Sequence, residues 1–479
     1  MPHDPRKLDR RDFLKATATL TGAAAVGSAP TAAAEPTPGA GAINEKDLIV
    51  RNRVPTMAYQ RLGRTNYLCS RIVQGFGGDE NLWRRLLARG VNYWDTGWGY
   101  GEGNHEKSLK PFLADHRDKL WITSKATNIA GFTRIDDEVR RLYLKAIKDF
   151  LPAEAYDRLE NGDDKQGRAD LLRFHEAAIA HQKATGKKPD LRPAGKRMAE
   201  LYLQRLDESL QRMGIEHVDA YFVHGIEIPW IFDCIEVWEA YEKAHKAGKV
   251  RHFGFSTHQH QKPVLAAAAE ANARGPWKID LIMPGVNPIT FDDWREELDA
   301  LHKQDVGIIA MKTTGMKGKP LEGARRDRLR QKAGEIADYN EWEQKKLYML
   351  HLTDGVIHAC IAAMKDNREM QRDLALPAVQ LSAEARRELK AYVKAGMAGA
   401  CHLCGNCAVH CPEHIALVDM IRYHAYLHQY NERELAAELY AQAGYDPAKL
   451  CSHCGKCTDA CDSGVKITEI LYQLSADLA

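Results

Sequence analysis

Length, composition and charge narrow the class of protein before any motif is considered. The chain has 479 residues, long enough for one large domain and a smaller one. Its 67 Lys and Arg nearly balance its 65 Asp and Glu. This balance excludes the strong basic charge that is typical of proteins binding nucleic acid or anionic membranes.

The N-terminus carries an arginine pair ahead of a mildly apolar stretch. Residues 9–15 read DRRDFLK, residues 16–29 are rich in Ala, Thr and Gly, and small residues follow at 32–34. The pattern resembles a twin-arginine export signal. We therefore expect residues 1–34 to be a cleaved signal and residues 35–56 to be a linker, with the protein in the periplasm or otherwise outside the cytoplasm. A chance Arg-Arg pair before a helix is the alternative, and the apolar run is too short to span a bilayer.

From residue 57 to residue 378, short β-branched runs alternate with amphipathic helical stretches. Such alternation is typical of βα units around a parallel sheet, and eight strands predict an α/β fold of the (β/α)8 TIM-barrel type. The expected strands are 72–76, 91–95, 120–125, 218–224, 250–256, 281–286, 306–312 and 356–362. Two connections, at about 126–195 and 313–355, are too long for ordinary loops and are charged and helix-favouring, so they predict helical insertions.

Four reactive side chains fall at or just after the carboxyl ends of expected strands, where barrel enzymes carry their active sites. Asp95 ends the second strand and Tyr100 follows it in the sequence DTGWGYG. Lys125 ends the third strand and His224 the fourth. This set resembles the catalytic tetrad of the aldo-keto reductase family. A surface tyrosine or a core histidine is the commoner explanation for each residue alone, but the joint pattern favours catalysis.

The resemblance to aldo-keto reductases extends along most of the expected barrel, to about residue 375. Residues 59–65, YQRLGRT, are similar to the N-terminal hairpin of that family, and residues 209–214, SLQRMG, also match. It implies an oxidoreductase that acts on a carbonyl or alcohol. A carbonyl that receives hydride needs a proton on its oxygen, which Tyr100 could supply. We expect Lys125, held charged by Asp95, to lower the pKa of Tyr100 from its ordinary ~10, with the histidine orienting the carbonyl.

The positions that hold NADP(H) in that family match less well. The expected contacts are Ser256, Thr257, Asn287, Lys365 and Arg368. Thr257 replaces the asparagine of a Ser-Asn pair, and residues 283–287, MPGVN, replace Gln-x-x-Tyr-Asn, which removes a polar contact and a stacking ring. Lys365 and Arg368 either meet a 2′-phosphate or begin a solvated helix. We therefore expect NADP(H) either to be carried tightly bound or to be absent.

The C-terminal region, residues 379–479, is expected to form a small, helix-rich, ferredoxin-like domain. Two cysteine runs share the spacing C-x2-C-x2-C-x3-C, which wraps a cubane iron–sulfur cluster; Pro412 follows the first run and Asp462 the second. In such pairs the fourth cysteine ligates the other cluster. One [4Fe-4S] cluster is thus assigned to Cys401, Cys404, Cys407 and Cys461, and the other to Cys411, Cys451, Cys454 and Cys457. Zinc sites and disulfides explain this spacing poorly. No repeat is evident beyond these runs.

Two hypotheses follow from these features. The first is an exported oxidoreductase of aldo-keto reductase type, acting on a small carbonyl or alcohol, with two clusters that exchange electrons with a redox partner protein. The second is a non-catalytic electron-transfer or scaffold protein whose barrel has lost nicotinamide binding. A hydride carries two electrons, whereas each cluster transfers one. The sequence therefore does not define how electrons pass between the barrel and the clusters. Nothing in the sequence identifies the substrate or the oligomeric state.

Overall fold

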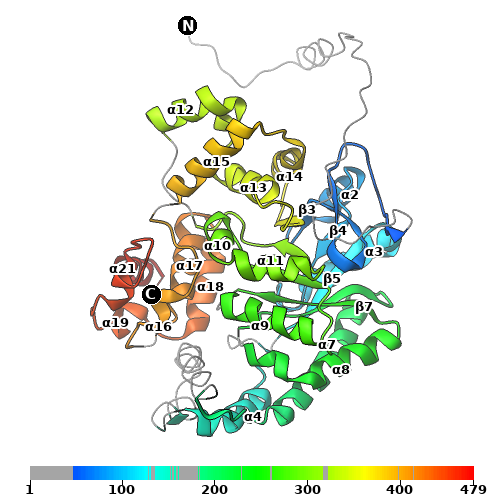
Figure 1. The fold of residues 1–479 in the computed structure, drawn as a ribbon, viewed down its shortest axis with the longest axis vertical. Helices are drawn as coiled ribbons and strands as arrows, with labels where there is room; N and C mark the ends of the chain where they lie inside the picture. Colours follow the sequence, from blue (N-terminus) through cyan, green and yellow to red (C-terminus); the bar gives the residue numbers. More distant parts are fainter. Residues whose placement is uncertain are drawn as a thin grey trace. The chain divides into compact units, whose positions relative to one another are not determined.

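The computed structural model describes residues 47–478, apart from 128, 131–134, 152, 154–155, 158–159, 161–181, 183, 228, 259–260, 317–321, 398 and 414 (Figure 1). The expected export signal lies outside the described residues, as do residues 35–46 of the expected linker and much of the first expected insertion. Within the described part of the chain, no helix combines the length and the apolar character that crossing a bilayer requires.

Eight parallel strands close into a barrel in the order β10-β3-β4-β5-β6-β7-β8-β9. They are β3 (Ile72–Gln74), β4 (Tyr93–Asp95), β5 (Trp121–Ala126), β6 (Val218–Val223), β7 (Val250–Thr257), β8 (Leu281–Pro284), β9 (Gly307–Ala310) and β10 (Ala359–Ala362). Each overlaps one expected strand, so the (β/α)8 prediction is confirmed. β5 and β6 are buried at every position, as expected for parallel strands covered on both faces. Tyr93, Trp121, Phe222 and Met283 help to fill the barrel interior.

An antiparallel hairpin of β1 (Tyr59–Arg61) and β2 (Leu68–Ser70) closes the amino end of the barrel. Between the strands, Gly63 adopts the left-handed φ of 51°, and a Cβ there would lie 2.3 Å from the Gly307 nitrogen. Only glycine therefore fits where the hairpin meets β9. This is the hairpin that the family resemblance implied.

Helices surround the barrel. They are α2 (Glu80–Ala88), α3 (Asn104–His116), α4 (Asp137–Ile147), α7 (Arg192–Met213), α8 (Ile235–Lys246), α9 (Gln261–Arg274), α10 (Pro288–Asp293), α11 (Arg295–Lys303), α12 (Gly323–Ala333), α13 (Glu341–His351), α14 (Asn367–Ala375) and α15 (Ala383–Gly396). In α7, Leu206, Leu210 and Met213 recur at helical spacing on the buried face, and left-handed Gly214 ends the helix.

The second expected insertion contains α12 and α13, and the described part of the first contains α4. These helices agree with the helix-favouring composition of both segments. The neighbouring helix α15 packs against α12 and α13, and its Leu389 and Val393 belong to the same hydrophobic core as the barrel helices. Helix α15 therefore packs with the barrel, although it lies in the segment that we assigned to the cluster domain. The domain boundary at residue 378 stays a prediction.

The rest of the C-terminal region is built from two similar halves. Its helices are α16 (Asn406–Val409), α17 (Leu417–His428), α18 (Arg433–Ala443), α19 (Pro447–Leu450), α20 (Lys456–Asp459) and α21 (Ile467–Leu478). Helices α20 and α21 lie 50 residues after α16 and α17. Leu403 and His453, at equivalent positions, both have a left-handed φ, of 60° and 57°, and Gly405 and Gly455 are also left-handed, at 87° and 74°. The repeat thus extends beyond the cysteine runs to which the sequence analysis limited it.

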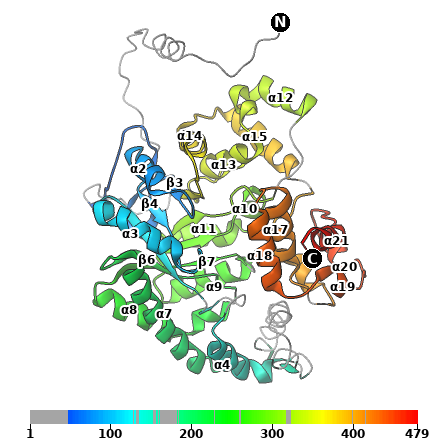
Figure 2. The ribbon, with the colours of Figure 1, turned by 180° about the vertical axis from the view of Figure 1, so that it is seen from behind.

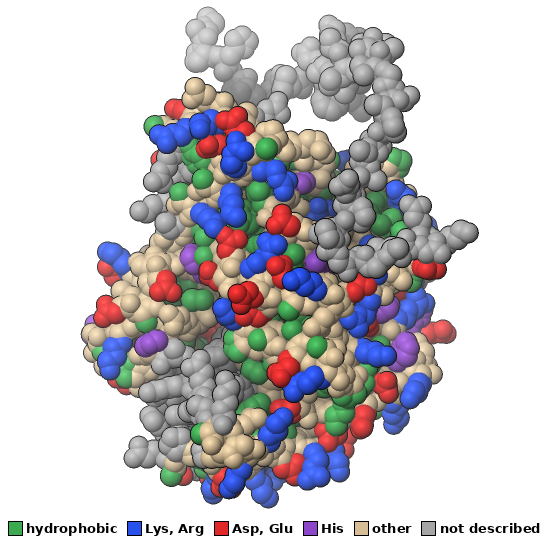
Figure 3. Space-filling view, in the orientation of Figure 1, with side chains coloured by type: hydrophobic (Ala, Val, Ile, Leu, Met, Phe, Trp, Pro, Cys, Tyr) green, Lys and Arg blue, Asp and Glu red, His purple; other side chains and the backbone are tan. Residues whose placement is uncertain are grey.

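Helix α17 packs against both α18 and α21. In two opposite views, α17 and α18 lie on the barrel side of this domain, whereas α19 and α21 lie away from the barrel (Figures 1 and 2). On the visible surface, basic and acidic side chains are interspersed, in keeping with the balanced composition (Figure 3).

Candidate active site and iron–sulfur sites

A buried ion pair lies at the carboxyl end of β4 and β5. The ammonium of Lys125 lies 2.6 Å and 2.7 Å from the two carboxylate oxygens of Asp95, and 2.7 Å from the carbonyl oxygen of Thr96. Both charged side chains are 1% exposed. Burial raises the pKa of Asp95 and lowers that of Lys125, and the attraction between the two opposes both changes. The three acceptors match the three donor hydrogens of the ammonium.

Tyr100 and His224 complete the expected tetrad around this pair. The Tyr100 hydroxyl donates to Asp95 Oδ2 at 3.3 Å, and the ring centroids of Tyr100 and His224 are 6.4 Å apart. Nδ1 of His224 lies 2.8 Å from the hydroxyl oxygen of Thr127, which orients the imidazole. A Cβ at Gly99 would lie 3.1 Å from the His224 ring, so the glycine permits a close approach of the β4 loop. The structure therefore brings all four residues together.

The expected effect of Lys125 on Tyr100 is wrong. The pKa of Tyr100 is raised well above its ordinary value, first by burial and then by the Asp95 carboxylate. The lysine directs its ammonium protons to Asp95 and Thr96, and its nitrogen lies 4.9 Å from the centroid of the Tyr100 ring. The Lys125 ammonium therefore stabilises the Asp95 carboxylate more than it would stabilise a Tyr100 phenolate. Tyr100 is consequently a poor acid in this site.

A second lysine, at the same end of the barrel, acts on a second tyrosine. Lys312 follows β9, and its positive charge acts on the hydroxyl of Tyr426 on α17. The pKa of Tyr426 is lowered, mainly by Lys312 and further by Arg422, against the opposing effects of burial and Asp419. The sequence analysis missed both members. Lys312 ends the seventh expected strand and could have been found there, whereas nothing in the sequence links Tyr426 to the barrel.

Three expected nicotinamide contacts lie on β7 or after β8. The hydroxyl oxygen of Ser256 accepts from the Gly225 nitrogen at 3.0 Å, and Thr257 is fully buried. Asn287 caps α10, because its side-chain oxygen accepts from the nitrogens of Ile289 and Thr290. Its side-chain amide donates to the carbonyl oxygen of His402 in the cluster domain, at 3.4 Å. The polar atoms of Ser256 and Asn287 are thus already engaged.

The two expected phosphate contacts lie beside α14. Lys365 forms an ion pair with Glu432 of the cluster domain, and Arg368 is exposed in the first turn of the helix. The Tyr430 hydroxyl adds a further link between the domains, since it donates to the Gly315 carbonyl oxygen at 2.6 Å. The cluster domain therefore already pairs with Lys365, one of the two side chains expected to contact a dinucleotide phosphate.

Two further positions argue against the family's way of holding nicotinamide. Met283 is 1% exposed and Val286 is fully buried, so neither presents an amide or an aromatic face at the mouth. Together with the engaged side chains of Asn287 and Lys365, these residues do not fit NADP(H) held as the resemblance implied.

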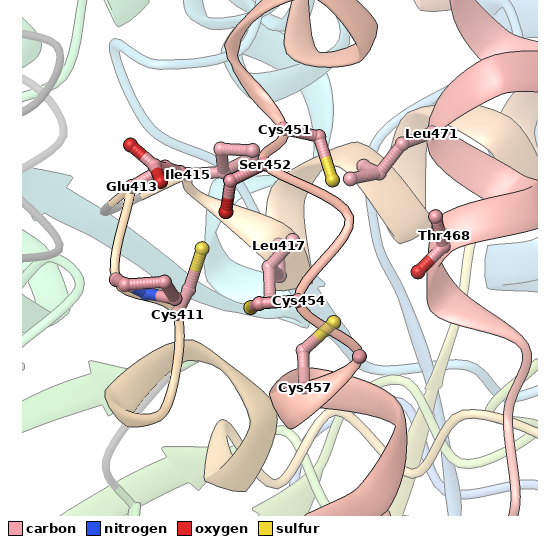
Figure 4. A pocket seen from close by; sticks show the side chains of 12 residues that line it. Cys411, Glu413, Ile415, Leu417, Cys451, Ser452, Cys454, Cys457, Thr468 and Leu471 are labelled. Atoms are coloured by element: carbon pink, nitrogen blue, oxygen red, sulfur yellow. The ribbon is translucent and has the colours of Figure 1, made fainter.

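The cysteines of one predicted group share a pocket, and those of the other group act electrostatically on one another. Cys411, Cys451, Cys454 and Cys457 line one pocket, and Figure 4 shows their sulfur atoms around a common space. In the other group, Cys401, Cys404 and Cys461 each act electrostatically on Cys407, which also senses Cys457. The two groups therefore adjoin. No three His, Cys, Asp or Glu side chains among the described residues converge as they would around a single ion.

Backbone N–H groups surround these sulfurs. The nitrogen of Leu403 donates to Cys401 Sγ and that of Val465 to Cys461 Sγ, each at 3.4 Å. Such bonds are among the features that set cluster potentials. Burial raises the pKa of the free Cys401 thiol to about 12, so a bound cation is needed to hold it as a thiolate. Four grouped thiols with amide donors fit a [4Fe-4S] cluster.

Comparison with known families agrees with both sites. Residues 191–333 match the aldo/keto reductase family, and residues 397–465 match the 4Fe-4S dicluster domain. The chain thus contains an aldo/keto reductase domain and a 4Fe-4S dicluster domain. It is an oxidoreductase. The first match includes His224 but begins after Asp95, Tyr100 and Lys125, so the grouping of the tetrad rests on the geometry alone.

A comparison with curated proteins finds no match. Similar solved structures include three aldo-keto reductases. The holo form of an enzyme from Bacillus halodurans is 19% identical, with 70% of this chain and 96% of that chain covered and a TM-score of 0.45. A thermostable enzyme bound to the inhibitor epalrestat is 18% identical, with 70% and 99% covered and a TM-score of 0.45. An enzyme from Brucella melitensis is 14% identical, with 71% and 99% covered and a TM-score of 0.44.

Proposed function

We propose that this protein is an exported oxidoreductase that interconverts a small carbonyl compound and its alcohol, exchanging electrons with a redox partner protein through two [4Fe-4S] clusters. One observation carries the proposal. The tetrad lies at the barrel end that also carries Asn287, and the side-chain amide of Asn287 donates to the His402 carbonyl oxygen of the cluster domain. A reaction site and an electron-carrying domain thus meet within one chain.

The barrel residues have separate tasks in this reaction. His224, oriented by Thr127, donates to the substrate oxygen and fixes the carbonyl in the mouth. The Asp95–Lys125 pair holds the Tyr100 hydroxyl beside it. When bound, the two clusters supply or accept one electron each, which matches the two electrons that separate a carbonyl from an alcohol. A proton must also reach the oxygen.

Export is the part of the proposal that rests on sequence alone. The arginine pair of residues 9–15 and the small residues at 32–34 resemble a twin-arginine signal. The resemblance implies transport of a folded protein with its cofactors installed, which suits thiolate-ligated clusters that an oxidising compartment could not assemble.

NADP(H) and a non-catalytic role remain as second candidates, each tied to a specific observation. The aldo/keto reductase match favours NADP(H), whereas buried Met283 and Val286 and the Lys365–Glu432 ion pair oppose it. The same three observations favour a scaffold whose barrel has lost its cofactor. The grouped tetrad supports catalysis instead.

The test uses anaerobically purified protein with both clusters loaded. Reduced viologen serves as donor for a panel of aldehydes and ketones, and oxidised viologen as acceptor for the matching alcohols. We expect turnover by the wild type and a loss of about 10²-fold or more in kcat for His224→Ala. The matched control, His245→Ala on the outer helix α8, should keep wild-type rates. Reduction of the clusters without turnover of any compound would favour the scaffold.

A further inference from the structure

We propose that Asn287, at the barrel mouth, raises the reduction potential of the cluster to which Cys401 is assigned, acting through the single peptide group that joins His402 to Leu403. This cluster is called the Cys401 cluster below. The inference depends on cluster binding in the C-terminal region and not on the carbonyl–alcohol reaction. It gives a residue of the barrel a direct part in the electron chemistry of the cluster domain.

Two hydrogen bonds share one peptide group. The side-chain amide of Asn287 donates to the carbonyl oxygen of His402 at 3.4 Å. The N–H of the same peptide group belongs to Leu403 and donates to Cys401 Sγ, also at 3.4 Å. A donor that binds the oxygen of a peptide makes its N–H a stronger donor, because hydrogen bonds in a chain polarise one another. The barrel side chain is therefore linked to a cluster sulfur through two bonds and one peptide.

The orientation of the Asn287 amide is fixed by its own helix. Its side-chain oxygen accepts from the nitrogens of Ile289 and Thr290 at the start of α10, at 3.0 Å and 3.3 Å. Its backbone nitrogen donates to the Thr290 hydroxyl at 2.9 Å, which completes a capping box. Because the oxygen is used within the barrel, the NH2 group is the end that faces His402. Asn287 is 2% exposed, so little solvent competes for this donor.

Close packing leaves the amide little room to move. A Cβ at Gly315 would lie 3.4 Å from Asn287 Nδ2 and 3.3 Å from Met397 Cε, and the glycine has a left-handed φ of 53°. The Gly315 carbonyl oxygen in turn accepts from the Tyr430 hydroxyl at 2.6 Å. Glycine at this position therefore lets the loop after β9, Asn287 and the segment before Cys401 approach one another.

The cysteine loop that receives this bond is held in place as well. Nδ1 of the His402 ring lies 3.1 Å from Ser463 Oγ, and Ser463 comes two residues after Cys461, the fourth ligand assigned to the same cluster. Leu403 is 6% exposed and has a left-handed φ of 60°, an uncommon conformation for a residue with a Cβ. The peptide between His402 and Leu403 is thereby fixed between the barrel and the sulfur.

The internal repeat indicates that the link to the barrel is specific to one cluster. In the second cysteine run, Ser452 and His453 occupy the positions of His402 and Leu403, and His453 is likewise left-handed. This loop follows α19, which lies away from the barrel in both views (Figures 1 and 2). Within the described part of the chain, no barrel side chain donates to the Ser452 carbonyl oxygen. The Asn287 bond therefore acts on the first cysteine loop alone.

The sign of the effect follows from charge. Reduction adds one electron, and hydrogen bonds to the sulfurs are among the features that set the potential, since donors stabilise the added negative charge. Asn287 strengthens the Leu403 donor, so it raises the potential of the Cys401 cluster. Both residues are buried, and in a low dielectric the two bonds are electrostatically stronger than in water. The effect biases an electron toward the cluster whose loop contacts the barrel mouth.

The variant Asn287→Ser separates this effect from the capping of α10. Serine is a good helix cap, so α10 should keep its start, but the short side chain does not reach the His402 carbonyl oxygen. The matched control is Tyr430→Phe, which removes the bond to the Gly315 carbonyl oxygen and keeps the ring that stacks on Trp342. The control weakens contact between the domains without changing the peptide that binds the sulfur.

Anaerobic redox titration followed by electron paramagnetic resonance measures the potentials. A Cys411→Ala background keeps the Cys401 cluster and a Cys461→Ala background keeps the other one, so each signal is read alone. At a fixed potential, Asn287→Ser should lower the ratio of reduced to oxidised Cys401 cluster by about two- to fivefold, because one neutral hydrogen bond has a modest effect. The other cluster should be unchanged, and Tyr430→Phe should match the wild type.

A second readout needs neither single-cluster backgrounds nor turnover. Resonance Raman spectra of the oxidised two-cluster protein report the stretching frequencies of the bonds between iron and cysteine sulfur. A weaker donor to Cys401 should raise one of these frequencies in Asn287→Ser and none in Tyr430→Phe. Unchanged potential and frequencies in Asn287→Ser would overturn the inference, and so would equal shifts in both variants. Failure of the wild type to turn over any carbonyl would overturn the proposed reaction and leave this inference intact.

Discussion

The side-chain amide of Asn287 donates a hydrogen bond of 3.4 Å to the carbonyl oxygen of His402. Asn287 follows β8 at the barrel mouth, and His402 follows Cys401, an expected cluster ligand. The bond therefore joins the cluster loop to the carboxyl end of the barrel. Because Asn287 is also an expected nicotinamide contact, we expect this contact between the domains to compete with nucleotide binding.

We predict that NADPH and NADH bind weakly or not at all to anaerobically purified, cluster-loaded protein. The reason is that Asn287 and Lys365 already have partners in the cluster domain, and that Met283 and Val286 are buried. Titration followed by nucleotide fluorescence and by cluster absorbance checks this, once the purified protein has been shown to carry no nucleotide. Glu432→Gln, which frees Lys365, should strengthen any residual binding of NADPH. Tight binding accompanied by cluster bleaching would contradict the prediction.

Cross-ligation predicts which cluster each fourth cysteine serves. Cys461→Ala should remove the cluster of Cys401, Cys404 and Cys407, and should lower the iron content from about eight to about four atoms per chain. Cys411→Ala should remove the other cluster, because Cys411 lines the pocket of the second run. Iron analysis and electron paramagnetic resonance of the reduced variants separate the two outcomes. Retention of the second-run signal in Cys411→Ala would show that each run binds its own cluster.

Export predicts a dependence on the arginine pair. Replacing Arg10 and Arg11 together by lysine keeps the charge but should stop transport, so the full-length chain should accumulate in the cytoplasm with its clusters assembled. Fractionation and immunoblotting follow the cleavage of residues 1–34. A Lys7→Arg variant is a matched control that leaves the pair intact. Normal export of the double-lysine variant would mean that the pair occurs by chance.

The buried Asp95–Lys125 ion pair predicts that a single substitution will strongly lower the free energy of unfolding. Asp95→Asn leaves the Lys125 charge uncompensated at 1% exposure, so the free energy of unfolding should fall by about 3–5 kcal/mol. Urea unfolding under anaerobic conditions measures this. Adding Lys125→Met to the same chain should recover part of the loss, because the uncompensated charge is then gone. Equal stability of Asp95→Asn and the wild type would show that the pair is solvated.

Much of the barrel could be predicted because its information is local. Each expected strand is a short β-branched run, and such a run is typical of a parallel strand that is buried on both faces. The reactive residues were predicted for the same reason. Asp95, Lys125 and His224 lie at or next to the carboxyl ends of strands, and in a parallel barrel all of these ends lie at the same mouth. The cysteine grouping likewise followed from spacing.

The unpredicted features depend on contacts between segments distant in sequence. Lys312 acts electrostatically on Tyr426, 114 positions away in a different domain, and no local pattern reports it. The pKa of Tyr100 was predicted in the wrong direction because the sequence shows that a cation is near but not where its protons point. The wider repeat escaped notice because α17 and α21 share their spacing and little of their sequence.

Buried histidines predict acid sensitivity of the barrel. The pKa of His105 is lowered to about 4 and that of His358 to about 3, chiefly by burial. Both values lie below the ~6.5 of an unfolded chain, so the unfolded state takes up protons first as pH falls. Their contribution to stability is therefore complete above pH ~6.5. It declines by up to ~1.4 kcal/mol per pH unit for each residue as pH falls toward the folded values.

Urea midpoints measured from pH 8 down to pH 4 test this sensitivity. In His358→Asn, which can still accept from the Ile308 nitrogen, the decline should be shallower than in the wild type. The matched control is His245→Asn, at an exposed position on α8. Equal slopes in wild type and His358→Asn would place the acid sensitivity elsewhere, with the buried carboxylates as the next candidates.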